Sequence, residues 1–64
     1  MNEVNQIGGA IDRASKYAVR ALKRNDDVAA YNTLKALVHM HIRDNNLSKA
    51  LLIIRIAKKI FEDF

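Results

Sequence analysis

Two polar tetrapeptides, Arg24-Asn25-Asp26-Asp27 and Arg43-Asp44-Asn45-Asn46, interrupt a chain of 64 residues whose remaining segments are periodically apolar. Asparagine and aspartate tolerate a left-handed backbone at the end of one helix and cap the first free N–H groups of the next. We expect Asp27 and Asn46 to be the N-caps. Breaks this short make neighbouring helices antiparallel. The sequence therefore predicts an all-α, up-down-up, three-helix antiparallel bundle in a single domain covering residues 1–64.

The predicted helices cover about residues 3–23, 28–43 and 47–62. The first has a coiled-coil-like seam at alternating spacings of three and four, made by Val4, Ile7, Ile11, Ala14, Ala18 and Ala21. Gly8 and Gly9 lie within that seam. Because each glycine costs up to about 1 kcal/mol relative to alanine in a helix interior, we expect the pair to weaken the first two turns.

The third segment has more apolar surface than two neighbouring helices can cover. Its apolar positions fill about half of the helical circumference, and Leu51 and Leu52 lie in the remaining polar arc. A second copy, another protein or a membrane surface would cover the excess, and we expect self-association, with a dimer favoured over a higher oligomer. The membrane is the least expected of the three, because three capped segments form a bundle more simply. The predicted interface comprises Leu51, Leu52, Ile53, Ile56, Ile60 and His41.

The two histidines do not make a metal site. His39 and His41 are two residues apart, which places them roughly 200° from each other around a helix, too far for one ion. His41 lies on the apolar face of the second segment and is expected in the core or an interface; the alternative is a pH-sensitive contact across a dimer interface. His39 belongs to the polar face. We expect no metal and no cofactor.

Basic residues are the main polar feature. The chain has 11 Lys and Arg against 7 Asp and Glu, a formal net charge of +4. Spacings of three and four align one ridge on the first helix, and a shorter ridge lies on the second: Arg13, Lys16, Arg20 and Lys23, then Lys35 and Arg43 with His39. Such a ridge is either a solvated outer face or a surface for phosphates or an acidic partner. No interleaved Asn or Gln is available to contact base edges.

Several functions are disfavoured by the same residues. The chain has no cysteine, and its serines have no histidine and acid at the spacing of a nucleophilic site, so we expect no catalytic residue and no enzyme. No signal-peptide pattern and no apolar run of about 20 residues is present, which favours the cytoplasm. We expect a small protein-binding adaptor or inhibitor of a larger, acidic partner, similar to the regulators that phages and mobile elements encode. The alternative is a basic helical nucleic-acid-binding protein that uses the first ridge.

Overall fold

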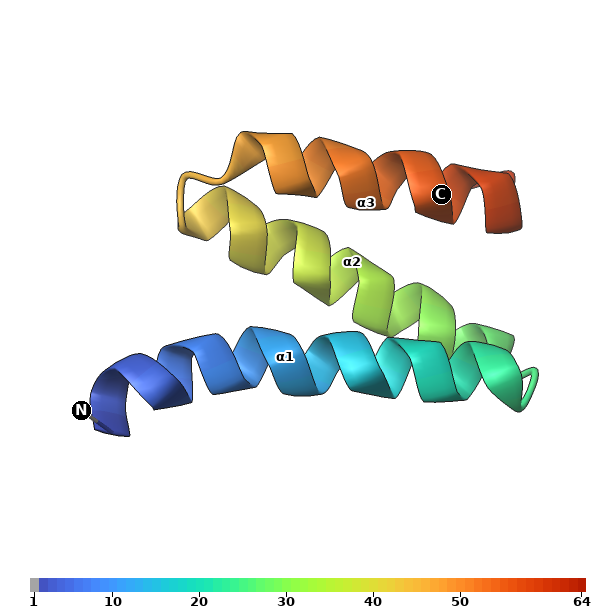
Figure 1. The fold of residues 1–64 in the computed structure, drawn as a ribbon. Coiled ribbons are helices and arrows are strands. Elements are labelled where there is room, and N and C mark those ends of the chain that lie inside the picture. Colours follow the sequence, from blue (N-terminus) through green and yellow to red (C-terminus); the bar gives the residue numbers. More distant parts are fainter. Residues whose placement is uncertain (1) are drawn as a thin grey trace.

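The computed structural model describes the backbone of residues 2–64 and the side chains of residues 9–64. Over that range the chain forms three α-helices and no strand: α1 at Asn2–Lys23, α2 at Asp27–Arg43 and α3 at Leu47–Ile60. The helices run up, down and up (Figure 1). The predicted all-α class and the predicted order are confirmed. The predicted ends agree to within one residue, except that α3 ends at Ile60 and not at residue 62.

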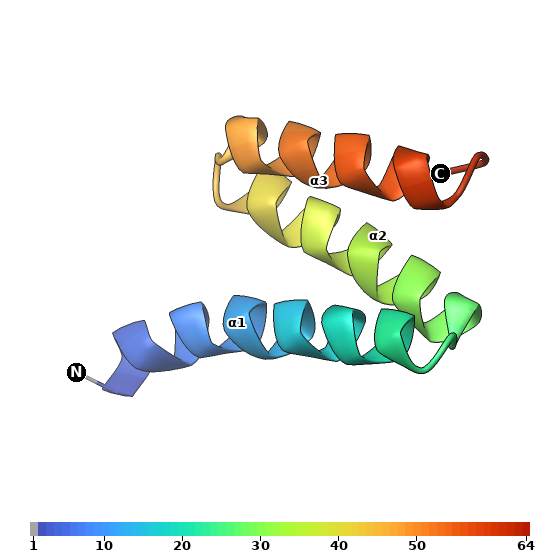
Figure 2. The ribbon, with the colours of Figure 1, turned by 45° about the vertical axis from the view of Figure 1, so that its right-hand side comes forward.

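The three helices lie in one layer, with α2 between α1 and α3 in both views (Figures 1 and 2). The backbone measures 38 × 24 × 12 Å along its principal axes, so the arrangement is flattened. α1 packs on α2 and α2 packs on α3, whereas no described Cα atom of α1 lies within 8 Å of one in α3. The bundle is therefore open, and α2 alone connects its two edges.

The two turns close by the same hydrogen bonds. Asn25 and Asn45 adopt left-handed backbones, with φ of 62° and 58°. In the first turn, the N–H groups of residues 25 and 26 donate to the carbonyls of residues 22 and 21, at 3.1 and 2.8 Å. In the second turn, residues 45 and 46 donate to residues 42 and 41, at 3.0 and 2.8 Å. This is the paired closure of a Schellman motif, which satisfies helix carbonyls that would otherwise have no partner.

One of the two predicted N-caps is correct. The Asn46 side chain accepts from the Lys49 N–H at 3.4 Å, which confirms Asn46. The prediction of Asp27 is wrong, since Asp26 accepts from the Ala29 N–H at 3.2 Å and Asp27 is already the first helical residue. The cap directly follows the left-handed residue in both turns. The left-handed Asn25 therefore makes Asp26, rather than its neighbour, the N-cap.

Alanine supplies much of the buried core. Ala21, Ala30, Ala50 and Ala57 are buried, and a core cluster joins all three helices through α2: Ala18, Leu34, Leu37 and Ala57. A small side chain at these positions lets helix backbones approach closely. Ile11 and Ala14 continue the predicted α1 seam against this core, while Val4 and Ile7 lie outside the described side chains. The α1 backbone is helical through Gly8 and Gly9.

Candidate interaction surfaces

The predicted interface residues separate into two groups. Ile53 is half-buried against the core and His41 is buried in α2, so these two residues belong to the fold. The other four are exposed on α3: Leu51 by 62%, Leu52 by 54%, Ile56 by 48% and Ile60 by 45%. Leu52, Ile56 and Ile60 follow a spacing of four and share one face of the helix. We call these three residues the α3 stripe.

Cations border the α3 stripe. The helix carries four basic residues, all exposed, and its sequence LSKALLIIRIAKKI contains no acid: Lys49, Arg55, Lys58 and Lys59. Among the described side chains, none of the four has a carboxylate within 4.0 Å. The stripe is therefore an apolar surface with an uncompensated positive border.

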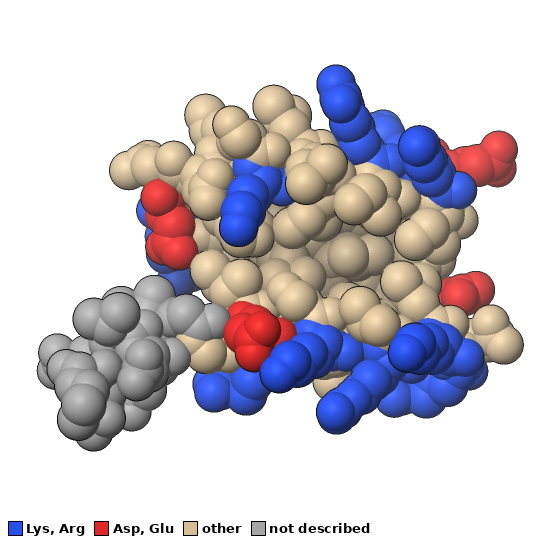
Figure 3. All heavy atoms as spheres, viewed as in Figure 1, with Lys and Arg blue, Asp and Glu red and all other residues tan. Residues whose placement is uncertain are grey.

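The face of the layer seen in Figure 3 is hollowed in its middle. Uncharged side chains line that hollow, while Lys and Arg gather along the α1 edge and over α3. Half-buried apolar side chains from the three helices pack around the core cluster, among them Ile11, Met40 and Ile53. These half-buried side chains adjoin the core cluster on all three helices.

The predicted ridge on α1 is present on the opposite edge of the layer. Arg13, Lys16, Arg20 and Lys23 are all exposed, and at a rise of 1.5 Å per residue they span about 15 Å. Lys16 Nζ lies 3.2 Å from Asp12 Oδ2, in a pair whose side chains are 67% and 62% exposed and which contributes little to stability. We call these four residues the α1 ridge.

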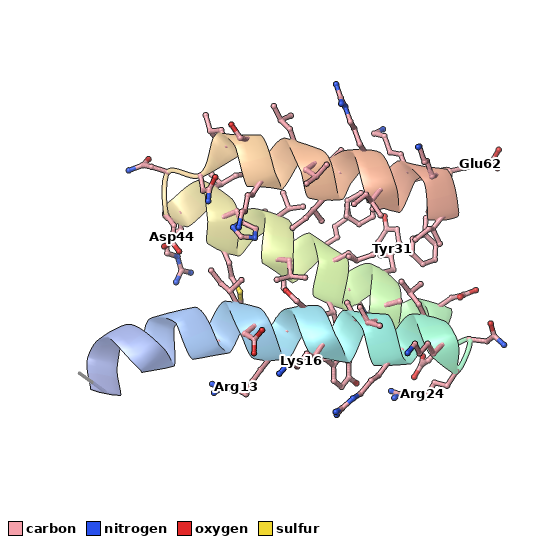
Figure 4. The ribbon with its side chains drawn as sticks, viewed as in Figure 1. Arg13, Lys16, Arg24, Tyr31, Asp44 and Glu62 are labelled. Carbon is pink, nitrogen blue, oxygen red and sulfur yellow. The ribbon has the colours of Figure 1, made fainter. Side chains whose placement is uncertain are left out.

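Arg24 extends the α1 ridge beyond the end of the helix, and the sequence analysis missed it. Its guanidinium lies 5.7 Å from the centre of the Tyr17 ring and 3.5 Å from Asp26 Oδ2. Figure 4 shows Arg13, Lys16 and Arg24 along the same edge. The spacing of four between Arg20 and Arg24 was the available signal.

The shorter ridge predicted on α2 keeps its spacing of four, with Lys35, His39 and Arg43 all exposed on one helix. Lys35 Nζ lies 5.2 Å from the Tyr31 ring centre and 5.4 Å from that of Phe64, so Lys35 is part of an aromatic cluster. Arg43 instead lines a hollow of about 220 Å³ between α1 and α2, beside Ile11 and Met40. Lys35 and Arg43 therefore lie at the two ends of the ridge, in different surroundings.

The aromatic cluster is the second feature that the sequence analysis missed. Tyr31 makes edge-on contacts with Phe61 and Phe64, at centroid distances of 5.4 and 5.3 Å, and its hydroxyl donates to the Asp63 carbonyl at 3.3 Å. Phe61 has an extended backbone, φ −124° and ψ 116°, which ends α3 and turns the last residues back toward α2. Figure 4 places Tyr31 between α2 and α3. The cluster holds the end of the chain against the layer.

Residues 9–64 contain no group of three or more His, Cys, Asp or Glu side chains that is suited to holding a metal ion. Of the helices described, none is both long enough and apolar enough to cross a membrane. The chain matches no family model, no curated protein and no solved structure. Its distinguishing chemistry is thus in the α3 stripe and the α1 ridge.

Proposed function

We propose that this chain is a small adaptor or inhibitor that binds a larger protein, and that the α3 stripe docks an amphipathic helix with acidic flanks. One observation carries the proposal. Leu52, Ile56 and Ile60 leave about half of each side chain exposed on a helix whose only charged residues are cations.

The spacing of the stripe favours a helical partner. Three aliphatic side chains four residues apart extend about 12 Å along α3, which is just over two helical turns. An amphipathic helix presents anchors at the matching spacing and buries them in an apolar groove.

The border of the stripe favours acidic flanks on that partner. Burying the stripe brings the partner's edge residues close to Arg55 and Lys59, where carboxylates gain attraction and cations are repelled. A second copy would place the same cations opposite one another, because α3 has no acid to offer in return. Charge complementarity thus favours a different protein over the homodimer expected from the apolar pattern alone.

The test uses a helical peptide with a Leu/Ile stripe and Glu flanks, and a second peptide with Lys in place of every Glu. Binding is measured by fluorescence anisotropy for the wild type, Leu52→Asp and Ile56→Asp, with Ala36→Asp on the exposed face of α2 as the matched control. We expect the Glu peptide to bind, and each stripe variant to weaken binding at least about tenfold while the control does not. Circular dichroism verifies that each variant is helical.

Two results would contradict the proposal. Equal binding of the Glu and Lys peptides, or no binding of either, would remove the acidic helix as the partner. Sedimentation equilibrium supplies the other result: a wild-type dimer that Leu52→Asp dissociates would make a second copy the occupant of the stripe.

A further inference from the structure

We infer that the α1 ridge binds the phosphate backbone of double-stranded nucleic acid without reading its base sequence. This site lies on the other edge of the layer from the α3 stripe and does not depend on it. With both edges occupied, the chain would hold a protein and a duplex at once.

The ridge has the shape of a phosphate contact. Its four cations stand on one helix with axial steps of about 4.5 and 6 Å, over a total of about 15 Å. Duplex DNA carries about one negative charge per 1.7 Å of its axis, so a row of this length reaches several phosphates at once. Arg24 lies at the end of the row but is paired with Asp26 Oδ2 at 3.5 Å, so it is not counted among the four.

Most of these cations are free to bind an anion. Among the described side chains, Arg13, Arg20 and Lys23 have no carboxylate within 4.0 Å. A Cβ atom at Gly9 would lie 3.2 Å from an Arg13 guanidinium nitrogen. With no side chain there, the Arg13 guanidinium lies close to the α1 backbone.

The composition of the ridge favours nucleic acid over an acidic protein. Protein interfaces gain most of their affinity from a desolvated apolar or aromatic centre. The centre of this ridge is charged, and the exposed apolar residues Tyr17 and Val19 lie at its sides. A hydrated polyanion needs no apolar centre, since released counterions drive its binding.

The residues around the ridge offer few partners for base edges. The α1 residues from Gly9 to Lys23 include no Asn or Gln. The hydroxyl of Ser15 in this segment donates to the Ile11 carbonyl at 2.8 Å. Contacts from Lys and Arg to phosphates fix a protein on the backbone and carry no sequence information directly. Binding is therefore expected to be equal for unrelated sequences.

The ridge and the stripe are separate. α2 lies between the helices that carry them, and the layer is 24 Å wide (Figure 1). A duplex along α1 consequently leaves the outer face of α3 open. Loss of one activity need not affect the other, so the two proposals fail independently.

The experiment measures anisotropy of two fluorescent DNA duplexes of unrelated sequence over a salt series. The test variant is Arg13→Gln/Lys16→Gln/Arg20→Gln/Lys23→Gln; the control, Lys49→Gln/Arg55→Gln/Lys58→Gln/Lys59→Gln, loses the same formal charge from α3. Gln preserves helix propensity at these exposed positions. We expect the wild type and the control to show a log–log salt slope of about −3 to −4, and the ridge variant to lose at least about tenfold in affinity with a flatter slope.

The inference is overturned if the wild type does not bind at low salt, if both quadruple variants lose affinity equally, or if one duplex sequence is strongly preferred. Polyglutamate in place of DNA tests the protein alternative: ridge-dependent binding of polyglutamate without binding of DNA also overturns it. Arg13→Lys/Arg20→Lys retains the charge and is expected to retain binding, which separates loss of phosphate contacts from loss of fold.

Discussion

Asn25 and Asn45 hold the same place in the two turns, with φ of 62° and 58°, and the spacing between them is also the spacing between the buried Ala30 and Ala50. Each junction therefore uses one local unit: a left-handed asparagine, a capping side chain directly after it, and an alanine at the contact one helical turn later. Both helical hairpins depend on this unit.

Replacing either left-handed asparagine with alanine is expected to lower the free energy of unfolding by about 1 kcal/mol, because a Cβ-bearing residue without a short polar side chain resists positive φ. Asn25→Gly and Asn45→Gly are the matched variants and are expected to stay near wild type, since glycine adopts this backbone without steric cost. Urea denaturation followed by circular dichroism measures both. Equal losses for Ala and Gly would show that the backbone angle is not the cause.

Asp26→Ala and Asp27→Ala distinguish the true N-cap from its neighbour. Removing the Asp26 oxygen that accepts from the Ala29 N–H is expected to cost about 1 kcal/mol. Asp27 contributes only a favourable charge in the first turn of α2, which is worth about 0.3 kcal/mol at an exposed position. Thermal and urea unfolding give the two values. A larger loss for Asp27→Ala would contradict the cap assignment.

Ala30→Leu is expected to destabilise the fold by about 1–3 kcal/mol, because Ala30 is completely buried and a larger side chain forces the helices apart. Ala36→Leu places the same side chain on the exposed face of the same helix and should change stability by less than about 0.5 kcal/mol. The comparison, made by urea denaturation, removes helix propensity as an explanation. Similar values for the two variants would argue against close packing at Ala30.

Phe64→Ala tests the aromatic cluster. The variant loses the edge-on contact with Tyr31 and the contact with Lys35, an expected cost of about 1–2 kcal/mol. Tyr31→Phe retains the ring and removes only the exposed hydrogen bond to Asp63, so its expected cost is below about 0.5 kcal/mol. Methyl and ring proton shifts in NMR spectra report whether the rings remain in contact. If Phe64→Ala leaves the Tyr31 shifts unchanged, the cluster does not form in solution.

The helices were predictable because their signals are local. Asn and Asp at the two breaks determined the turns, and the 3.6-residue period determined which faces are apolar, including the exposed leucines and isoleucines of α3. The predicted N-cap of α2 is wrong by one residue because two adjacent aspartates offer equivalent side chains. The left-handed angle of Asn25 decides between them.

The remaining features depend on contacts between distant residues. The helical periodicity of the sequence continues past Ile60, so it does not predict the end of α3 at Phe61. Tyr31, thirty residues earlier, supplies the surface that Phe61 contacts. The same cluster places Lys35, at one end of the second ridge, against the Tyr31 and Phe64 rings. The width of a helix's apolar arc also does not specify how many neighbouring helices pack against it. The sequence therefore could not show that α1 and α3 each pack on α2 and not on each other.

The open order of the layer determines how the chain transmits a perturbation. Over the described residues, α1 and α3 are connected through α2, so stability is approximately the sum of two adjacent interfaces, as in a short linear array. A substitution in α2 weakens both interfaces, whereas one in α1 or α3 weakens a single interface. A partner bound to α3 consequently raises the free energy of local unfolding of the α2–α3 hairpin directly. It raises the free energy of unfolding α1 from α2 only to the extent that α2 becomes more ordered.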